Sequence, residues 1–177
     1  MVIFMIEIAP EIREFYNLAK EVARGSMCHK TKFGAVLISE NNMFLSAGHN
    51  VPICGDCNDH GGCLRIGVKS GENAERCHAI HAEQNAIITA LSNETIKAPE
   101  LVGATIVLYG EYPDGEEWDM RGLFPCTLCS RLMAFVGIGG VVAKSWSELV
   151  FMPIQQVLET SYLVHQNIGR ELRGLGF

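Results

Sequence analysis

Apolar side chains recur every three or four positions in several stretches of the chain, a pattern typical of amphipathic helices. In residues 10–24 they alternate with charged side chains, with Pro10 suited to a first helical turn and Gly25 to a helix end. We expect this helix to be structural. The same periodicity predicts further helices at 81–91, 126–136 and 153–166.

Short continuous apolar runs predict buried strands at 33–38, 43–47, 104–109 and 141–143. The sequence Glu40-Asn41-Asn42 is a turn signal between the first two, so these should form a hairpin. The strands after the hairpin alternate with helical segments. This order predicts an α/β fold in which helical crossovers join the later strands.

The chain length of 177 residues predicts a single domain with enough chain to bury a core. A net charge of −6 argues against a surface that binds nucleic-acid backbone. No apolar run is as long as a membrane helix, and the start lacks the basic segment of a signal peptide. We therefore expect a cytoplasmic protein, with residues 167–177 as a tail.

Seven cysteines without a secretion signal indicate metal or thiol chemistry in a reducing compartment. Residues 52–76 form a predicted irregular insertion rich in Gly, Cys, Asp and Asn, and so long a loop needs a tie. Four thiolates could supply it by holding a second, structural zinc ion. The five candidate ligands are Cys28, Cys54, Cys57, Cys63 and Cys77. The possible substitutes are His29, His60 and His78. A cluster of reduced thiols and a redox control site are the alternatives.

Two short motifs carry the strongest chemical signal. His81-Ala82-Glu83 opens a predicted helix, and Pro125-Cys126-Thr127-Leu128-Cys129 opens the next one. Together they give the His-x-Glu and Pro-Cys-x-x-Cys signature of zinc-dependent nucleobase deaminases. His81, Cys126 and Cys129 are candidate zinc ligands that leave the fourth position open to water, as catalytic sites require. Glu83 is the candidate for moving protons to and from that water.

Further residues are candidates for contacting a substrate. Asn50 follows a predicted strand and could face a ligand, although a turn role is the commoner one for a lone asparagine. The polar loop 110–123 and the aromatic residue after it could cover a ligand, and the candidates for this are Trp118, Arg121 and Phe124. The alternative is a surface loop with one packed aromatic side chain. Candidate phosphate contacts, or else exposed basic side chains, are Arg65, Lys69 and Arg121.

Over residues 10–143 the chain resembles the cytidine and deoxycytidylate deaminase superfamily, most closely its deoxycytidylate (dCMP) deaminase branch. Besides the zinc motifs, the resemblance rests on four pieces of sequence: Lys32-Phe33-Gly34-Ala35-Val36, Gly48-His49-Asn50, Gly62-Cys63-Leu64-Arg65, and Cys77 four residues before His81. It departs from the family at His49 and Val51 and in the length of 110–124.

The resemblance implies a three-layer α/β/α fold with a mixed five-stranded sheet. It implies zinc on His81, Cys126 and Cys129, Glu83 as the proton shuttle, and Asn50 in contact with the base. The backbone N–H of Ala82 would hold the pyrimidine carbonyl. A homo-oligomer is expected, and some members carry a second zinc.

The predicted function is zinc-dependent hydrolytic deamination of a cytosine nucleotide, with dCMP converted to dUMP and ammonia released. One alternative is a deaminase of another aminated base: a nucleoside, another heterocycle or a base in RNA. Another is a non-catalytic zinc ribbon that joins Cys54-x-x-Cys57 to Cys126-x-x-Cys129, although the gap between these pairs is longer than ribbon spacing.

Overall fold

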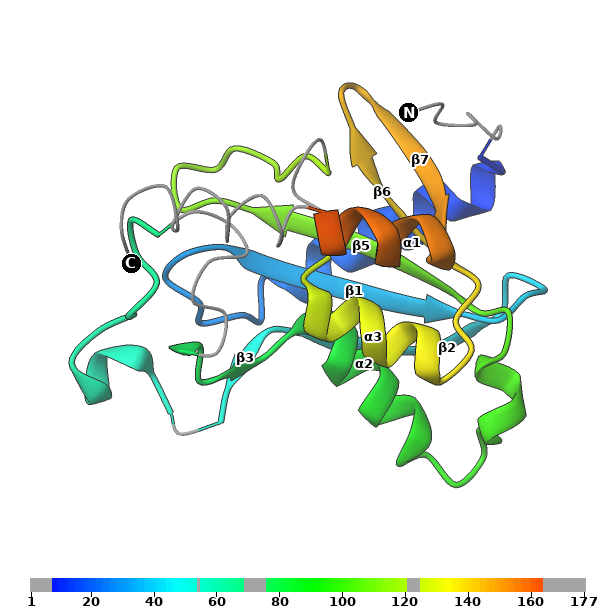
Figure 1. The fold of residues 1–177 in the computed structure, drawn as a ribbon, viewed down its shortest axis with the longest axis horizontal. Helices are drawn as coiled ribbons and strands as arrows, with labels where there is room; N and C mark the ends of the chain where they lie inside the picture. Colours follow the sequence, from blue (N-terminus) through cyan, green and yellow to red (C-terminus); the bar gives the residue numbers. More distant parts are fainter. Residues whose placement is uncertain (1–7, 54, 69–75, 121–124, 164–177) are drawn as a thin grey trace.

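A computed structural model describes residues 8–53, 55–68, 76–120 and 125–163 (Figure 1). Several predicted features lie outside the described residues: the tail at 167–177, Cys54, Lys69, Arg121 and Phe124. The first helix, α1, spans Pro10–Ala23 and is followed by strands β1 (Lys32–Ile38), β2 (Phe44–His49) and β3 (Val51–Pro52).

The second half of the described chain alternates strands and helices. A short 3-10 helix at Cys57–His60 precedes β4 (Ala79–Ile80) and α2 (Ala82–Leu91). After a further 3-10 helix at Ala98–Leu101, the chain forms β5 (Thr105–Glu111), α3 (Thr127–Phe135), β6 (Gly140–Ser145) and β7 (Glu148–Pro153). Residues 154–163 are helical. No described helix is long and apolar enough to cross a membrane.

The main sheet has five strands in the order β2-β1-β5-β6-β7. The β1–β2, β1–β5 and β6–β7 pairs are antiparallel, and the β5–β6 pair is parallel, so the sheet is mixed. The two short strands β3 and β4 pair antiparallel in a separate small sheet, with Val51 opposite Ile80. This pairing brings the chain before α2 next to the chain after β2.

Helices cover both faces of the sheet, which gives three layers (Figure 1). Side chains alternate along β5, so Val107 and Tyr109 face α1 while Ile106 and Leu108 face α2 and α3. Val157, from the helical residues 154–163, packs in the same core as α2 and α3. The expected three-layer α/β/α architecture with a mixed five-stranded sheet is confirmed.

A glycine allows α2 to lie directly on the hairpin strand β2. A Cβ atom at Gly48 would lie 2.5 Å from the backbone nitrogen of Ala86, which is closer than any side chain tolerates. The hydroxyl of Ser46 then donates a 2.7 Å hydrogen bond to the carbonyl of Ala86. This close contact fixes the start of α2, and therefore His81 and Glu83, relative to the sheet.

The predicted helices and the strands β1, β2, β5 and β6 lie close to their observed positions, but the predictions missed the short strands β3 and β4 and the edge strand β7. Leu149, Val150, Phe151 and Met152 form this strand, and its turn from β6 has no glycine or asparagine to mark it. Trp146 instead takes the left-handed conformation at φ 58°. The last predicted helix is helical from residue 154 onward, directly after this strand.

Candidate metal and catalytic centre

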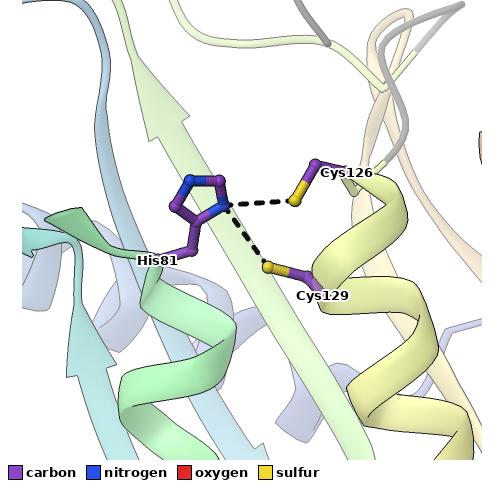
Figure 2. Close-up of side chains that lie close together, drawn as sticks. All are labelled: His81, Cys126 and Cys129. Carbon is purple, nitrogen blue, oxygen red and sulfur yellow. Dashed lines mark hydrogen bonds between the residues drawn. The ribbon is translucent and has the colours of Figure 1, made fainter. Parts of the chain in front are cut away.

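The N-terminal ends of two neighbouring helices carry three side chains that converge on one point (Figure 2). His81 is the residue before α2, Cys126 is the residue before α3, and Cys129 lies in the first turn of α3. The Nδ1 atom of His81 lies 3.3 Å from the Cys126 Sγ and 3.4 Å from the Cys129 Sγ. These contacts join segments far apart in the chain.

The geometry of the three side chains suits zinc. Their ligand atoms all lie within 4.8 Å of one another, and among the described residues this is the one such group of three or more His, Cys, Asp or Glu side chains. In a tetrahedral site with usual zinc bond lengths, nitrogen and sulfur ligands are about 3.5 Å apart. The observed separations are close to this value. One imidazole and two thiolates also form a donor set that zinc favours.

The electrostatics of the group favour a cation. The hydrogen bond with Cys129 lowers the pKa of the Cys126 thiol most, and His81 adds to this effect against burial, so that it reaches about 4. Burial lowers the pKa of His81, but hydrogen bonds with Cys126 and Cys77 outweigh it and raise this pKa to about 11. The group thus holds a proton among its ligand atoms. A metal ion in its place would release that proton.

Glu83 lies in the first turn of α2, beside this group. The residue is 5% exposed, and burial raises the pKa of its carboxyl although the nearby His81 opposes the effect. The carboxylate does not belong to the compact set of ligand atoms. A buried carboxyl next to a metal-binding group, with its pKa raised by burial, is suited to taking up and releasing protons.

Comparison with known proteins agrees with this chemistry. The sequence profile of the family described as "Cytidine and deoxycytidylate deaminase zinc-binding region" matches residues 10–145. The chain belongs to this family. Zinc is therefore the metal to expect at the His81 group; the assignment of the individual ligands stays a prediction.

Three deoxycytidylate deaminases are similar in sequence. The Schizosaccharomyces pombe protein is 31% identical over 132 residues, 72% of this chain and 35% of that protein. The Saccharomyces cerevisiae protein is 26% identical over 92% of this chain and 44% of its own length. The Mycobacterium phage D29 protein is 29% identical over 72% and 89%, respectively. The chain thus spans less than half the length of the two yeast proteins.

Two solved structures share the fold of this deaminase-family chain. The dCMP deaminase of cyanophage S-TIM5 superposes with a TM-score of 0.50 at 24% identity, covering 76% of this chain and 82% of that one. The cytidine deaminase of Burkholderia pseudomallei superposes with a TM-score of 0.52 at 16% identity, covering 82% and 94%. At these identities the superpositions support the fold.

Asn50 is held by the protein itself. Asn50 is 6% exposed. Its carboxamide oxygen accepts hydrogen bonds from the Phe33 N–H at 2.8 Å and the Ser26 hydroxyl at 2.6 Å. Its amide nitrogen donates to the Thr31 carbonyl at 2.9 Å. Asn50 therefore fastens the loop before β1 to the end of β2. Contact with a base would have to use the remaining amide hydrogen, so that role stays a prediction.

The loop after β5 is packed onto the protein. Trp118 is 4% exposed and contacts the Phe33 ring edge-to-face at a centroid distance of 5.3 Å. Met120, also buried, donates its backbone N–H to the Lys144 carbonyl at 2.8 Å. The structure therefore supports the packed-loop alternative for Trp118 over a role as an exposed cover.

The remaining cysteines lie near one another without forming a compact ligand set. Burial, followed by the thiols of Cys63, Cys28 and Cys77, raises the pKa of Cys57. Within the described residues, however, these sulfur atoms do not form a group with all members within 4.8 Å. His29, a possible substitute, is hydrogen-bonded to Asp56 at 2.8 Å. The second zinc site stays a prediction.

Cys77 also contacts the first site, which the sequence did not reveal. A hydrogen bond with His81 lowers the pKa of the Cys77 thiol to about 7, against the opposing effect of burial. Cys77 stands four residues before His81, and the short strand β4 lies between the two. This spacing was the one sequence signal for their contact. Cys77 thus connects the His81 group to the cysteine-rich insertion.

Proposed function

We propose that this chain catalyses the zinc-dependent hydrolytic deamination of a cytosine nucleotide, dCMP, giving dUMP and ammonia. The observation that carries the proposal is the buried Glu83 carboxyl beside the converging ligand atoms of His81, Cys126 and Cys129. The printed names of the yeast and phage relatives support the choice of substrate. The enzyme would thus be a hydrolase acting on a carbon–nitrogen bond of a cyclic amidine.

Zinc held by His81, Cys126 and Cys129 would supply a nucleophile by lowering the pKa of a coordinated water. Glu83 accepts a proton from the attacking water and delivers it to N3 of the cytosine ring. The water oxygen forms a bond to C4. Glu83 then transfers the second water proton to the amine at C4 as the carbon–nitrogen bond breaks, and ammonia leaves. Burial of Glu83 suits both transfers, because it raises the proton affinity of the carboxylate and so brings it closer to that of the groups with which Glu83 exchanges protons.

Two further residues orient the base in this proposal. Ala82 is the first residue of α2, so its N–H is one of the backbone donors that a helix leaves without an intrahelical acceptor. We assign it to the pyrimidine carbonyl. Asn50 places the loop before β1 through its bonds to Phe33, Ser26 and Thr31, and offers its remaining amide hydrogen to the substrate.

The proposal extends to the assembly of the chain. We assign residues 1–177 to one deaminase domain that works in the cytoplasm as a homo-oligomer. Exposed apolar side chains on α3 support association, since Phe135 is 89% exposed and Leu128 is 51% exposed. A second, structural zinc in the insertion at 52–76 would use four of Cys28, Cys54, Cys57, Cys63 and Cys77. Light scattering and metal analysis test these two points.

Ammonia release tests the proposed activity. Purified, zinc-replete protein is given dCMP and deoxycytidine in parallel, and product formation is followed by loss of cytosine absorbance. Turnover of dCMP supports the proposal, and a chelator should abolish it. Release of ammonia from another aminated base but from neither cytosine compound would contradict the substrate assignment while keeping the chemistry.

A further inference from the structure

The side chain of Asn85 joins α2 to the end of β2. Its amide nitrogen donates a 2.8 Å hydrogen bond to the backbone carbonyl of His49. A carbonyl only accepts hydrogen bonds, so the nitrogen of the amide, and not its oxygen, must face it. Asn85 also packs tightly on Gly48, where an added Cβ atom would lie 2.9 Å from the Asn85 Cβ. The bond and the packing together hold the start of α2 against the last two residues of β2.

A second link holds the same segment on the other side of His81. Val51 pairs with Ile80 in the small sheet formed by β3 and β4. Asn50 directly precedes Val51 in the chain, and His81 directly follows Ile80. In an antiparallel ladder, the next pair along is therefore Asn50 and His81. This pairing brings the backbone of the proposed base-contacting residue next to that of a zinc-ligand candidate.

The two links close a ring around the start of α2. The backbone N–H of Asn85 donates to the His81 carbonyl at 2.9 Å, as the helix requires. The side chain of Asn85 then returns to His49, the residue before Asn50. Glu83 lies in the helical part of this ring, between His81 and Asn85. The ring therefore fixes the backbone of Glu83 relative to that of Asn50.

We propose that Asn85 is a positioning residue for the deamination reaction. Its amide keeps Glu83 where the carboxylate can exchange protons with a base that Asn50 orients, so it acts through these two residues. This inference rests on the proposed function. Proton transfer needs donor and acceptor within hydrogen-bond reach, and a misplacement of about 1 Å can lower an enzyme's rate about 100-fold.

The side chain of Asn85 is the link that a substitution can remove. The other links of the ring are backbone hydrogen bonds, which remain when a side chain is changed. Asn85→Ala deletes the amide. Asn85→Asp keeps its size, but an ionised carboxylate cannot donate to the His49 carbonyl. Both variants therefore open the ring at one place and leave the side chains of the zinc-ligand candidates in place.

Asn93 provides a matched control beyond the other end of α2. Its amide oxygen accepts hydrogen bonds from the Thr95 N–H at 3.0 Å and the Thr95 hydroxyl at 2.8 Å. Asn93→Ala thus also removes asparagine hydrogen bonds beside the same helix, but outside the ring. If the Asn85 amide only stabilises the fold, both alanine variants should lose stability and keep the kinetics of the folded protein.

The kinetic test separates positioning from stability. We expect Asn85→Ala and Asn85→Asp each to lower kcat for dCMP by about 10- to 100-fold, while bound zinc and KM stay close to wild type. Asn93→Ala should keep the wild-type kcat. Thermal unfolding shows that each variant is folded at the assay temperature. Equal kcat in Asn85→Ala and Asn93→Ala, or a loss of kcat that follows a loss of zinc, would overturn the inference.

Hydrogen exchange keeps this inference separate from the proposed activity. The backbone amides of Asn50 and Ile53 each donate a hydrogen bond, of 3.2 Å and 3.1 Å. Both should exchange about 3- to 10-fold faster in Asn85→Ala and at the wild-type rate in Asn93→Ala. Faster exchange in a protein that does not turn over dCMP would uphold the ring and contradict the proposed function. Unchanged exchange would overturn the role of Asn85 even in an active enzyme.

Discussion

The imidazole of His81 and the thiol of Cys126 face each other at 3.3 Å, although 45 positions separate them in the chain. Each is the residue directly before a helix, so the positive ends of the α2 and α3 dipoles both point at the space between them. Such ends stabilise the thiolate form of a cysteine. Two helix starts therefore build the metal-binding group together.

Removal of one thiolate should remove the metal. We expect Cys129→Ala to weaken zinc affinity by more than about 100-fold, because a buried direct ligand is lost. Loss of a residue that only hydrogen-bonds to a metal ligand usually weakens affinity by about 10- to 100-fold. Metal content after gel filtration is the measurement. Cys57→Ala is the matched control and should keep one zinc per chain at the His81 group. A Cys129→Ala protein that keeps this zinc would contradict the ligand assignment.

Replacement of Asn50 separates its structural role from a substrate role. Asn50→Ala removes three hydrogen bonds from a buried site, and we expect it to lower the free energy of unfolding by about 2–4 kcal/mol, since donors of the loop before β1 lose their acceptor. Denaturant unfolding measures the loss. The exposed Asn41→Ala variant should be neutral. An unchanged stability with a raised KM would show that Asn50 acts only on the substrate.

Glu117 joins the loop after β5 to two other elements. Its carboxylate bonds to Lys144 of β6 at 2.5 Å and to Lys20 of α1 at 3.1 Å, and these partners lower its pKa, Lys144 most. All three side chains are partly exposed, so we expect Glu117→Gln to cost about 0.5–1 kcal/mol at neutral pH.

The pH dependence of this cost follows from the lowered pKa. Glu117 contributes this stability in full above the ordinary carboxyl pKa of 4.5. The contribution is lost as the pH falls through the lower pKa that Glu117 has in the folded protein. The stability difference between wild type and Glu117→Gln should therefore vanish in acid. The exposed Glu94→Gln variant is the control. A difference that grows as the pH falls would contradict this assignment.

Sequence reasoning worked where the information was local. The periodicity of α1 and the apolar runs of β1 and β5 set their positions to within a few residues. The turn before β7 contains Trp146 in a left-handed conformation, which local turn rules do not anticipate.

The candidate site divides in the same way. His81, Glu83, Cys126 and Cys129 belong to two compact motifs, so spacing alone brought them forward. The hydrogen bond from the Lys30 ammonium to the Val68 carbonyl joins two irregular loops, and no local pattern reports such a contact. Trp118 packs against Phe33, which lies far away in the chain on β1. Because the sequence does not show this contact, Trp118 looked like an aromatic residue free to cover a ligand.

Glu83→Gln in parallel with wild type tests the central claim most directly. The amide keeps the size of the side chain but cannot carry protons, so we expect ammonia release from dCMP to fall by at least about 100-fold while bound zinc stays the same. Thermal unfolding checks that the variant is folded. Full activity in Glu83→Gln, or loss of zinc together with activity, would contradict the assignment of Glu83 as the proton-transferring residue.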